Sequence, residues 1–289
     1  MKTVLKIVLP VLLFFTGCTV MPSSKKLQVV VSVYVLEEFA DRIGGDLIQV
    51  TNLVPPGIEP HDFELSAQDR IKLQNADVLL SIGVGFENWL SEVAPKLTNT
   101  LVIKTGEGIA TQPKDPHIWL DPNLAKVMAM KIRDALVQVD PQNRTTYFAN
   151  AQTLVTELSV LDVLYRTTLA NRVRDLFISS HNAFSYLAKA YGLHQEAIAG
   201  ANPEEDVSAM RVKEIINLIN TQNIPVVFTE EFLDPKIAEA IAKETRAAIL
   251  TLVPVENLSA SERKNGETYF SLMKKNLYAL YTALMEVSL

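Results

Sequence analysis

Residues 141–172 read PQNRTTYFANAQTLVTELSVLDVLYRTTLANR and contain no strand-like run. Their apolar residues recur at three- and four-residue spacing through Leu154, Leu158 and Leu161, which predicts one amphipathic helix. A helix of about 30 residues is ~45 Å long, enough to run down a whole molecule. Residues 122–138 are also helical in pattern, and no strand separates the two stretches. We therefore expect one long, rigid linking helix within residues 139–172.

Short apolar runs alternate with helical segments on both sides of this helix. The expected strands are residues 27–32, 48–54, 77–82, 100–104, 175–179, 224–229 and 248–253. The other expected helices are residues 34–43, 66–75, 86–93, 122–138, 182–191, 210–221, 235–245 and a last one from about 266. Such alternation predicts an α/β fold with mainly parallel sheets flanked by helices. We expect two lobes, an N-terminal one over residues 27–138 and a C-terminal one over residues 173–289.

The first residues have the pattern of an export signal. A short basic start precedes an apolar stretch, Ile7–Phe15, which is too short to span a membrane. It ends in Thr16-Gly17-Cys18, which resembles a bacterial lipoprotein signal. We expect residues 1–17 to be removed, Cys18 to carry acyl chains such as palmitate, and residues 18–26 to form a polar tether. The protein would then be anchored to a bacterial membrane on its extracellular or periplasmic face. The alternative is an ordinary secretory signal with an incidental cysteine.

Composition excludes several classes of protein. Hydrophobic residues make up 48% and charged residues 21% of the 289, as in ordinary globular proteins and unlike disordered chains. The net charge is −6 and no basic run occurs, so nucleic acid is not an expected partner. A single cysteine excludes an intramolecular disulfide framework and cysteine-based zinc or iron–sulfur sites.

Three of the four histidines lie in loops that follow predicted strands or precede predicted helices. His61 lies in the segment Glu59-Pro60-His61-Asp62-Phe63, His117 in DPHIWLDP (residues 115–122), and His181 directly after a strand. In open α/β sheets, ligands bind beyond the carboxyl ends of the strands. Any one of these histidines alone could be an ordinary polar residue, and His194, in a predicted turn, is interpreted that way.

Glu267, in the segment GETY that opens the last helix, is the fourth candidate. Three imidazoles and one carboxylate would supply a four-coordinate site for a divalent cation such as zinc. By itself, Glu267 could be no more than an acid at the start of a helix, stabilised by the helix dipole.

Several motifs together resemble one family. They are GIEPHDFELSAQD, DPHIWLDP, SHNAFSYLAKAYGL, FTEEFLDPKIAEAIAKET and GETYFSLMKKNL. The sequence from about Leu27 to the C-terminus is similar to the metal-binding lipoproteins of bacterial ABC transporters for zinc and manganese, the cluster A-I (cluster 9) substrate-binding proteins. The resemblance implies two α/β lobes linked by one long helix, with the metal held between them by His61, His117, His181 and Glu267. It also implies a monomer that delivers the ion to an ABC permease driven by a cytoplasmic ATPase.

Two departures from the family pattern bear on the cargo. Many relatives have Asp where Glu267 stands, and residues 106–114 lack the histidine-rich insertion of many zinc carriers. His181 as a third imidazole favours zinc, whereas two histidines with two carboxylates would suit manganese better. Manganese therefore stays an alternative cargo.

Two alternatives of other classes remain open, a secreted zinc hydrolase and a surface adhesin. A hydrolase needs an open position on the metal, whereas a fourth protein ligand closes it, and the sequence has no HExxH motif. We expect a binding protein and not an enzyme. Because imidazoles bind metal only when neutral, we expect affinity to fall as pH drops through ~6.5. Glu59, Asp62 and Asp121 are the candidates for hydrogen bonds to the far side of the imidazoles.

Overall fold

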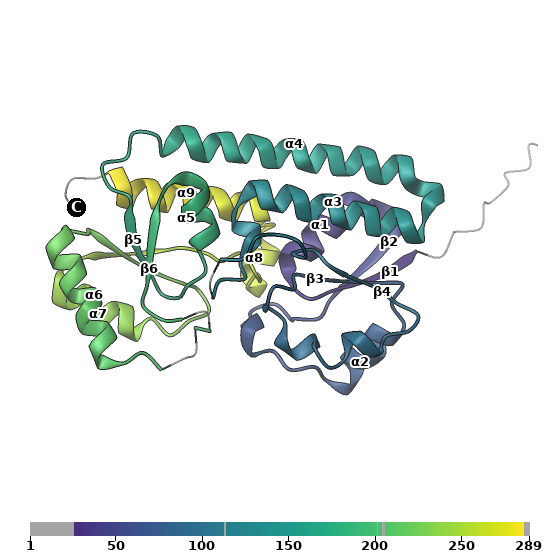
Figure 1. Ribbon diagram of the computed structural model, residues 1–289, viewed down its shortest axis with the longest axis horizontal. Coiled ribbons are helices and arrows are strands. Elements are labelled where there is room, and N and C mark those ends of the chain that lie inside the picture. Colours follow the sequence, from purple (N-terminus) through teal and green to yellow (C-terminus); the bar gives the residue numbers. More distant parts are fainter. Residues whose placement is uncertain (1–25, 113, 201, 204–205, 286–289) are drawn as a thin grey trace, which may run out of the picture.

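The computed structural model describes residues 26–112, 114–200, 202–203 and 206–285 (Figure 1). The expected signal peptide, Cys18 and all of the tether except Lys26 lie outside the described residues. In the part of the chain that is described, no helix is both long and apolar enough to cross a membrane.

Two four-stranded parallel sheets form the centres of two lobes, as the alternating pattern predicts. The strands are β1 (Leu27–Val31), β2 (Ile48–Asn52), β3 (Val78–Ser81) and β4 (Leu101–Lys104), then β5 (Leu176–Ser179), β6 (His194–Ala197), β7 (Val226–Thr229) and β8 (Ala248–Thr251). The strand order is β2-β1-β3-β4 in the first sheet and β6-β5-β7-β8 in the second, and every pairing is parallel. The two sheets therefore have the same topology.

Helices flank both sheets. They are α1 (Tyr34–Gly44), α2 (Ala67–Gln74), α3 (Pro122–Val139), α4 (Arg144–Thr168), α5 (Ser185–Tyr191), α6 (Ala209–Gln222), α7 (Lys236–Thr245), α8 (Ala260–Lys264) and α9 (Tyr269–Met285). The 25-residue helix α4 lies along the top of both lobes, with α3 and α9 beneath it (Figure 1). Leu154, Leu158 and Leu161 face the core, as their spacing predicts.

One apolar core runs through both lobes. Buried side chains of β1, α1, α3, α4, β5, α5 and α9 belong to a single hydrophobic cluster. The phenol of Tyr165 on α4 donates a hydrogen bond of 2.6 Å to the carbonyl of Met273 on α9. The long helix is thus packed against both halves of the molecule, which opposes free rotation of one lobe against the other.

Three elements differ from the sequence expectations, and one of them is the short helix α8, which was not expected. Strand β6 was not expected, because its residues HQEA are polar and it is an edge strand with no continuous apolar run. Residues 86–93 form a short 3₁₀ turn, Asn88–Leu90, instead of a helix. Here the Glu87 carboxylate accepts hydrogen bonds from the preceding backbone, and Gly83 and Gly85 have positive φ.

The chain returns to the N-terminal lobe after its last strand. Residues 254–268, called the crossing segment below, connect β8 to α9 and include α8. Buried Asn276 of α9 holds the start of this segment, since its amide pairs with both the N–H and the carbonyl of Val253. The segment then hydrogen-bonds to α1 and to the loop after β2.

Candidate metal site

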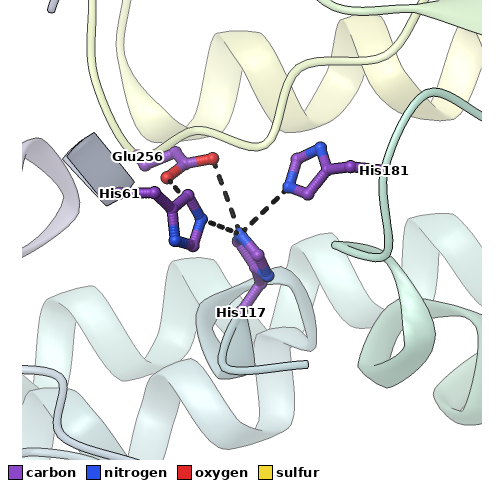
Figure 2. Close-up of side chains that lie close together, drawn as sticks. All are labelled: His61, His117, His181 and Glu256. Atoms are coloured by element: carbon purple, nitrogen blue, oxygen red, sulfur yellow. Dashed lines mark hydrogen bonds and ion pairs between the residues drawn. The ribbon is translucent and has the colours of Figure 1, made fainter. Parts of the chain in front are cut away.

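Four side chains that could hold a metal ion meet between the lobes: His61, His117, His181 and Glu256 (Figure 2). His61 lies in the loop after β2, His117 after β4, His181 after β5 and Glu256 after β8. Each therefore follows the carboxyl end of a parallel strand, where open α/β sheets place their ligands. The three histidines predicted from the sequence do come together.

One possible ligand atom of each of the four side chains lies within 4.8 Å of the others. His117 Nε2 lies 3.2 Å from His61 Nε2 and 3.4 Å from His181 Nε2. The two Glu256 oxygens lie 3.5 Å from the Nε2 atoms of His61 and His117. Zinc–nitrogen bonds of 2.0–2.1 Å in tetrahedral geometry place neighbouring donor atoms about 3.3 Å apart. The distances from His117 Nε2 to the other two imidazoles, and from Glu256 to His61 and His117, are therefore close to those that a zinc ion needs.

Glu256 is a buried carboxylate without a hydrogen-bond donor of its own. The residue is only 2% exposed, and neither carboxylate oxygen has a hydrogen-bond partner among the described residues. Burying an unpaired carboxylate is unfavourable unless a cation compensates its charge. The two oxygens face His61 and His117, so a cation bound among these imidazoles would supply that charge.

His117 is oriented by Asp115. Asp115 Oδ1 lies 2.8 Å from His117 Nδ1 and also accepts a hydrogen bond of 2.8 Å from the His117 backbone N–H. Its other oxygen accepts from the backbone N–H of Ser185, so the carboxylate is fixed at both ends. A proton on Nδ1 facing Asp115 leaves the Nε2 lone pair free to bind a metal.

His181 lies against Glu230, which holds its backbone by a hydrogen bond and meets its ring at short distance, although His181 Nδ1 has no hydrogen bond of good geometry among the described residues. Glu230 Oε1 accepts a hydrogen bond of 3.1 Å from the His181 backbone N–H, and Glu230 Oε2 lies 2.7 Å from His181 Nδ1. Both residues are buried. A carboxylate behind each of two imidazoles is the usual support of metal-binding histidines.

The pKa values of the clustered groups are strongly shifted. Burial lowers the pKa of His61 to about 4, against the attraction of Glu256. Burial also opposes protonation of His117, but contacts with Asp115 and Glu256 outweigh it and raise the pKa of His117 to about 10. For Glu256, burial is outweighed by the neighbouring imidazoles, which lower its pKa to about 2. In the metal-free protein the protonated His117 ring therefore faces Glu256 and partly compensates its charge, and a bound metal ion would replace that proton.

The structure corrects the expected fourth residue, because Glu256 takes the place predicted for Glu267. Glu267 accepts hydrogen bonds from Lys275 Nζ and from the Ser271 hydroxyl, near the start of α9. Those contacts lower the pKa of Glu267 and direct its carboxylate away from the histidines. Glu267 is thus an acid next to a helix start, the alternative that its position before α9 had left open.

The carboxylates behind the imidazoles also differ from the expected ones. Glu59 accepts from the backbone N–H of His61 and not from its ring. Burial, and then the charge of Glu256, raise the pKa of Glu59 to about 8. Asp62 is exposed, and Asp121 caps α3 by accepting from the Asn123 backbone N–H. Asp115 and Glu230 occupy the predicted role instead.

Fold and site together define a two-lobe binding protein for a divalent metal ion. Three imidazoles and one carboxylate leave no open position for a reacting water in a tetrahedral site, and an enzyme would need one.

Residues 29–283 match the family described as "ZnuA: Zinc-uptake complex component A periplasmic". The chain belongs to this family of binding components of zinc-uptake complexes. Family membership confirms the expectation of a binding protein rather than an enzyme.

Three relatives illustrate the likeness. The chain is 32% identical to the "High-affinity zinc uptake system protein ZnuA" of Bacillus subtilis, over 90% of this chain and 88% of that protein. It is 32% identical to the "Zinc-binding lipoprotein AdcA" of Streptococcus pneumoniae over 93% of this chain, but spans only 58% of that longer protein. The crystal structure of the Zn(II)-bound ZnuA-like domain of this AdcA superposes with a TM-score of 0.82 at 32% identity, covering 91% of this chain and 100% of that one. The laminin-binding protein Lmb of Streptococcus agalactiae, described as a bifunctional adhesin and metal transporter, has a TM-score of 0.82 at 31% identity, with coverage of 89% and 99%.

Proposed function

We propose that this protein captures zinc outside the cytoplasm and delivers it to the permease of an ABC transporter, with His61, His117, His181 and Glu256 as the ligands. One observation carries the assignment. A buried carboxylate without hydrogen-bond partners faces imidazole nitrogens that are spaced as zinc requires.

Zinc is the proposed cargo, with manganese as the alternative. Zinc accepts four nitrogen and oxygen donors in a tetrahedron, whereas manganese prefers a larger number of oxygen donors. Of the further carboxylates next to the site, Glu59 accepts from the His61 backbone N–H, while Asp115 and Glu230 face the far nitrogens of His117 and His181. The latter two are thus engaged in orienting the imidazoles, which supports a site with three nitrogens and one carboxylate.

The ion is cargo, so the protein binds and releases it without chemical turnover. Release occurs at the permease, which a cytoplasmic ATPase drives, and the protein works as a monomer. The proposal includes the export signal over residues 1–17, a lipid anchor on Cys18 and a tether to residue 26. It also keeps the division into lobes at 27–138 and 173–289 with the linking helix between. Surface adhesion, known from the name of the Lmb relative, remains the alternative role.

Two matched substitutions test the ligand assignment. E256Q removes a ligand charge with little change of shape, and E267Q does the same at the position outside the site. In a soluble chain starting at residue 23, we expect about one zinc per wild-type molecule by elemental analysis. E256Q should weaken zinc binding at least a hundredfold in competition with a chelator, and E267Q should leave it unchanged.

The outcomes separate the parts of the proposal. If E267Q weakens zinc binding and E256Q does not, the ligand set is wrong. If wild-type protein prefers manganese when both metals are offered equally, the transport role stands and the cargo changes. If wild-type protein retains neither metal, the proposed function fails.

A further inference from the structure

The crossing segment belongs to the C-terminal lobe by sequence but to the N-terminal lobe by its contacts. The indole N–H of Trp119 donates a hydrogen bond of 2.7 Å to the carbonyl of Pro254. The backbone N–H of Tyr34, at the start of α1, donates one of 3.0 Å to the carbonyl of Glu256. These two bonds hold the backbone on either side of Val255, where the side chain of Glu256 extends to the metal site.

Asn257 fastens the same segment to the loop that carries His61. Its side-chain amide donates to the carbonyls of Pro55 at 2.7 Å and of Ile58 at 2.8 Å. The Gly57 N–H donates in return to the carbonyl of Leu258 at 2.9 Å. Asn257 is 1% exposed, so water does not compete for these bonds. The backbone that bears Glu256 and the loop that bears His61 are therefore held as one unit.

Farther along, the crossing segment is pinned to α1. The guanidinium of Arg263 donates to both oxygens of Glu37, at 2.7 and 2.8 Å. On the side of the C-terminal lobe, Glu231 meets Glu262 of the segment. Burial and the like charge of Glu262 raise the pKa of Glu231, and Glu231 also hydrogen-bonds to the side chains of Ser259 and Glu262. The segment thus has a contact with the C-terminal lobe as well, although it lacks there a charge pair like that of Arg263 and Glu37.

His181, in contrast, is held by residues of the C-terminal lobe. It follows β5, and its backbone and ring both meet Glu230, which follows β7 of the same sheet. Its contacts with a carboxylate thus lie within the C-terminal lobe, whereas its ring meets the N-terminal lobe where its Nε2 lies 3.4 Å from His117 Nε2. The bond from the Ser185 N–H to Asp115 also joins the lobes here, so their separation has to break it.

We infer that Glu256 moves together with the N-terminal lobe, because Asn257 holds it there. Separation of the lobes therefore removes only His181 from the bound ion. The inference rests on the proposed function and describes how the same site loads and releases its ion. An opened molecule keeps His61, His117 and Glu256 together as a three-donor site. Zinc therefore leaves in two stages, first from His181 and then from the other three ligands.

The first experiment removes the fastening and leaves all four ligands in place. N257A should speed zinc dissociation about tenfold, measured by stopped flow with excess chelator, because Glu256 is no longer held against His61. N150A is the matched control. Asn150 donates a comparable hydrogen bond to the carbonyl of Ile43, joining α4 to α1, away from the four ligands. Its loss should leave zinc dissociation unchanged, although both variants lose a side-chain bond to a carbonyl.

A double-mutant cycle then asks whether Asn257 acts through Glu256. In the E256Q background, N257A should cause no further acceleration of zinc dissociation. In the H181A background, the tenfold effect should persist, because Asn257 and His181 belong to different lobes. An equal effect of N257A in both backgrounds would overturn the inference, since it would show a general loosening of the structure.

A substitution at an exposed residue gives a second test in case N257A does not fold. R263Q should speed zinc dissociation a few-fold, and the charge-swapped pair E37R/R263E should restore the wild-type rate. Unchanged dissociation in both R263Q and N257A would overturn the inference. If zinc binding is lost in E256Q while N257A has no effect, the proposed function survives and only the inference falls. Wild-type protein that binds no zinc would overturn both.

Discussion

The two lobes have the same strand order, but a buried glutamate near the end of the corresponding strand has different partners in each. After the third strand in each sheet order stands a buried glutamate, Glu87 after β3 and Glu230 after β7. Glu87 accepts hydrogen bonds from the Ser32 hydroxyl and from two backbone N–H groups. Glu230 instead faces the backbone and ring of His181.

The difference arises at the residues that follow the first strand of each lobe. Ser32 directly follows β1, whereas Ser180 and His181 follow β5. A hydroxyl gives the glutamate a short structural hydrogen bond, and an imidazole turns the same carboxylate into support for a metal ligand. One scaffold thus provides a structural carboxylate in one lobe and a functional one in the other.

The largest expected effect concerns the two imidazoles of the N-terminal lobe, whose pKa values move in opposite directions. At neutral pH the free protein carries a proton on His117, whose pKa is about 10, while His61, with a pKa of about 4, is neutral. Zinc must displace the His117 proton, so binding releases about one proton and affinity rises about tenfold per pH unit. Between pH 5.5 and 8.5 we expect a gain of about a thousandfold in chelator competition.

This window differs from the fall near pH 6.5 that ordinary imidazoles predict. The rise should continue above pH 7.5, and below about pH 4 it should become steeper as His61 also takes up a proton. A plateau of affinity above pH 7 would show that His117 behaves as an unperturbed histidine.

Next in size is the effect of E87Q on stability. The amide offers one acceptor where the carboxylate serves three donors, and at least one buried donor then lacks a partner. We expect a loss of about 2–3 kcal/mol in the free energy of unfolding, measured by urea denaturation, with zinc affinity unchanged in the folded protein. A large loss of zinc affinity with intact stability would refute the structural role of Glu87.

E230Q should show the reverse pattern. Replacing this carboxylate weakens the orientation of the His181 ring, and loss of such a partner typically lowers metal affinity about 10–100-fold. Its effect on urea unfolding of the metal-free protein should be smaller than that of E87Q. If the two variants behave alike in both assays, the contrast between the lobes is not real.

The smallest effects should come from helices α2 and α6, which contribute no residue to the candidate metal site. Ser66 caps α2 in a reciprocal capping box with Asp69, and Ser208 caps α6 by accepting from the Arg211 N–H. S66A and S208A should each cost about 1 kcal/mol of stability, with S66A the larger because Asp69 also loses a partner. Zinc affinity should stay constant in both, and a change would link the caps to the site.

Much of the architecture could be predicted from the sequence because apolar periodicity reports directly on burial. The long helix, the parallel sheets and the three histidines all follow from local patterns. Strand β6 could not be found this way, since a polar edge strand is defined by its pairing with β5 and not by its own residues.

The fourth member of the candidate site differs from the one that the motifs predicted. Glu267 lies in a conspicuous motif, but its neighbours Ser271 and Lys275 bind its carboxylate. Glu256 lies five residues beyond the end of β8, where the rule for α/β sheets places ligands, and that rule could have found it. Asp115 and Glu230 could also have been predicted from their positions. Glu230 directly follows β7, and Asp115 lies two residues before His117. Which carboxylate faces which ring nitrogen depends on packing between the lobes, and local sequence does not encode it.

The contacts of the crossing segment also constrain the order in which parts of the chain can fold. Glu37 and Arg263 are separated by 226 residues, and the Tyr34 phenol reaches the Glu267 carbonyl across 233. Contacts of such long range form late, because a large loop must close before they contribute stability. A chain that emerges amino end first therefore presents a first lobe whose helix α1 still lacks its final partners. The candidate ligand Glu256 follows the last sheet strand, so the proposed four-ligand site is complete only when that strand and the residues after it have emerged.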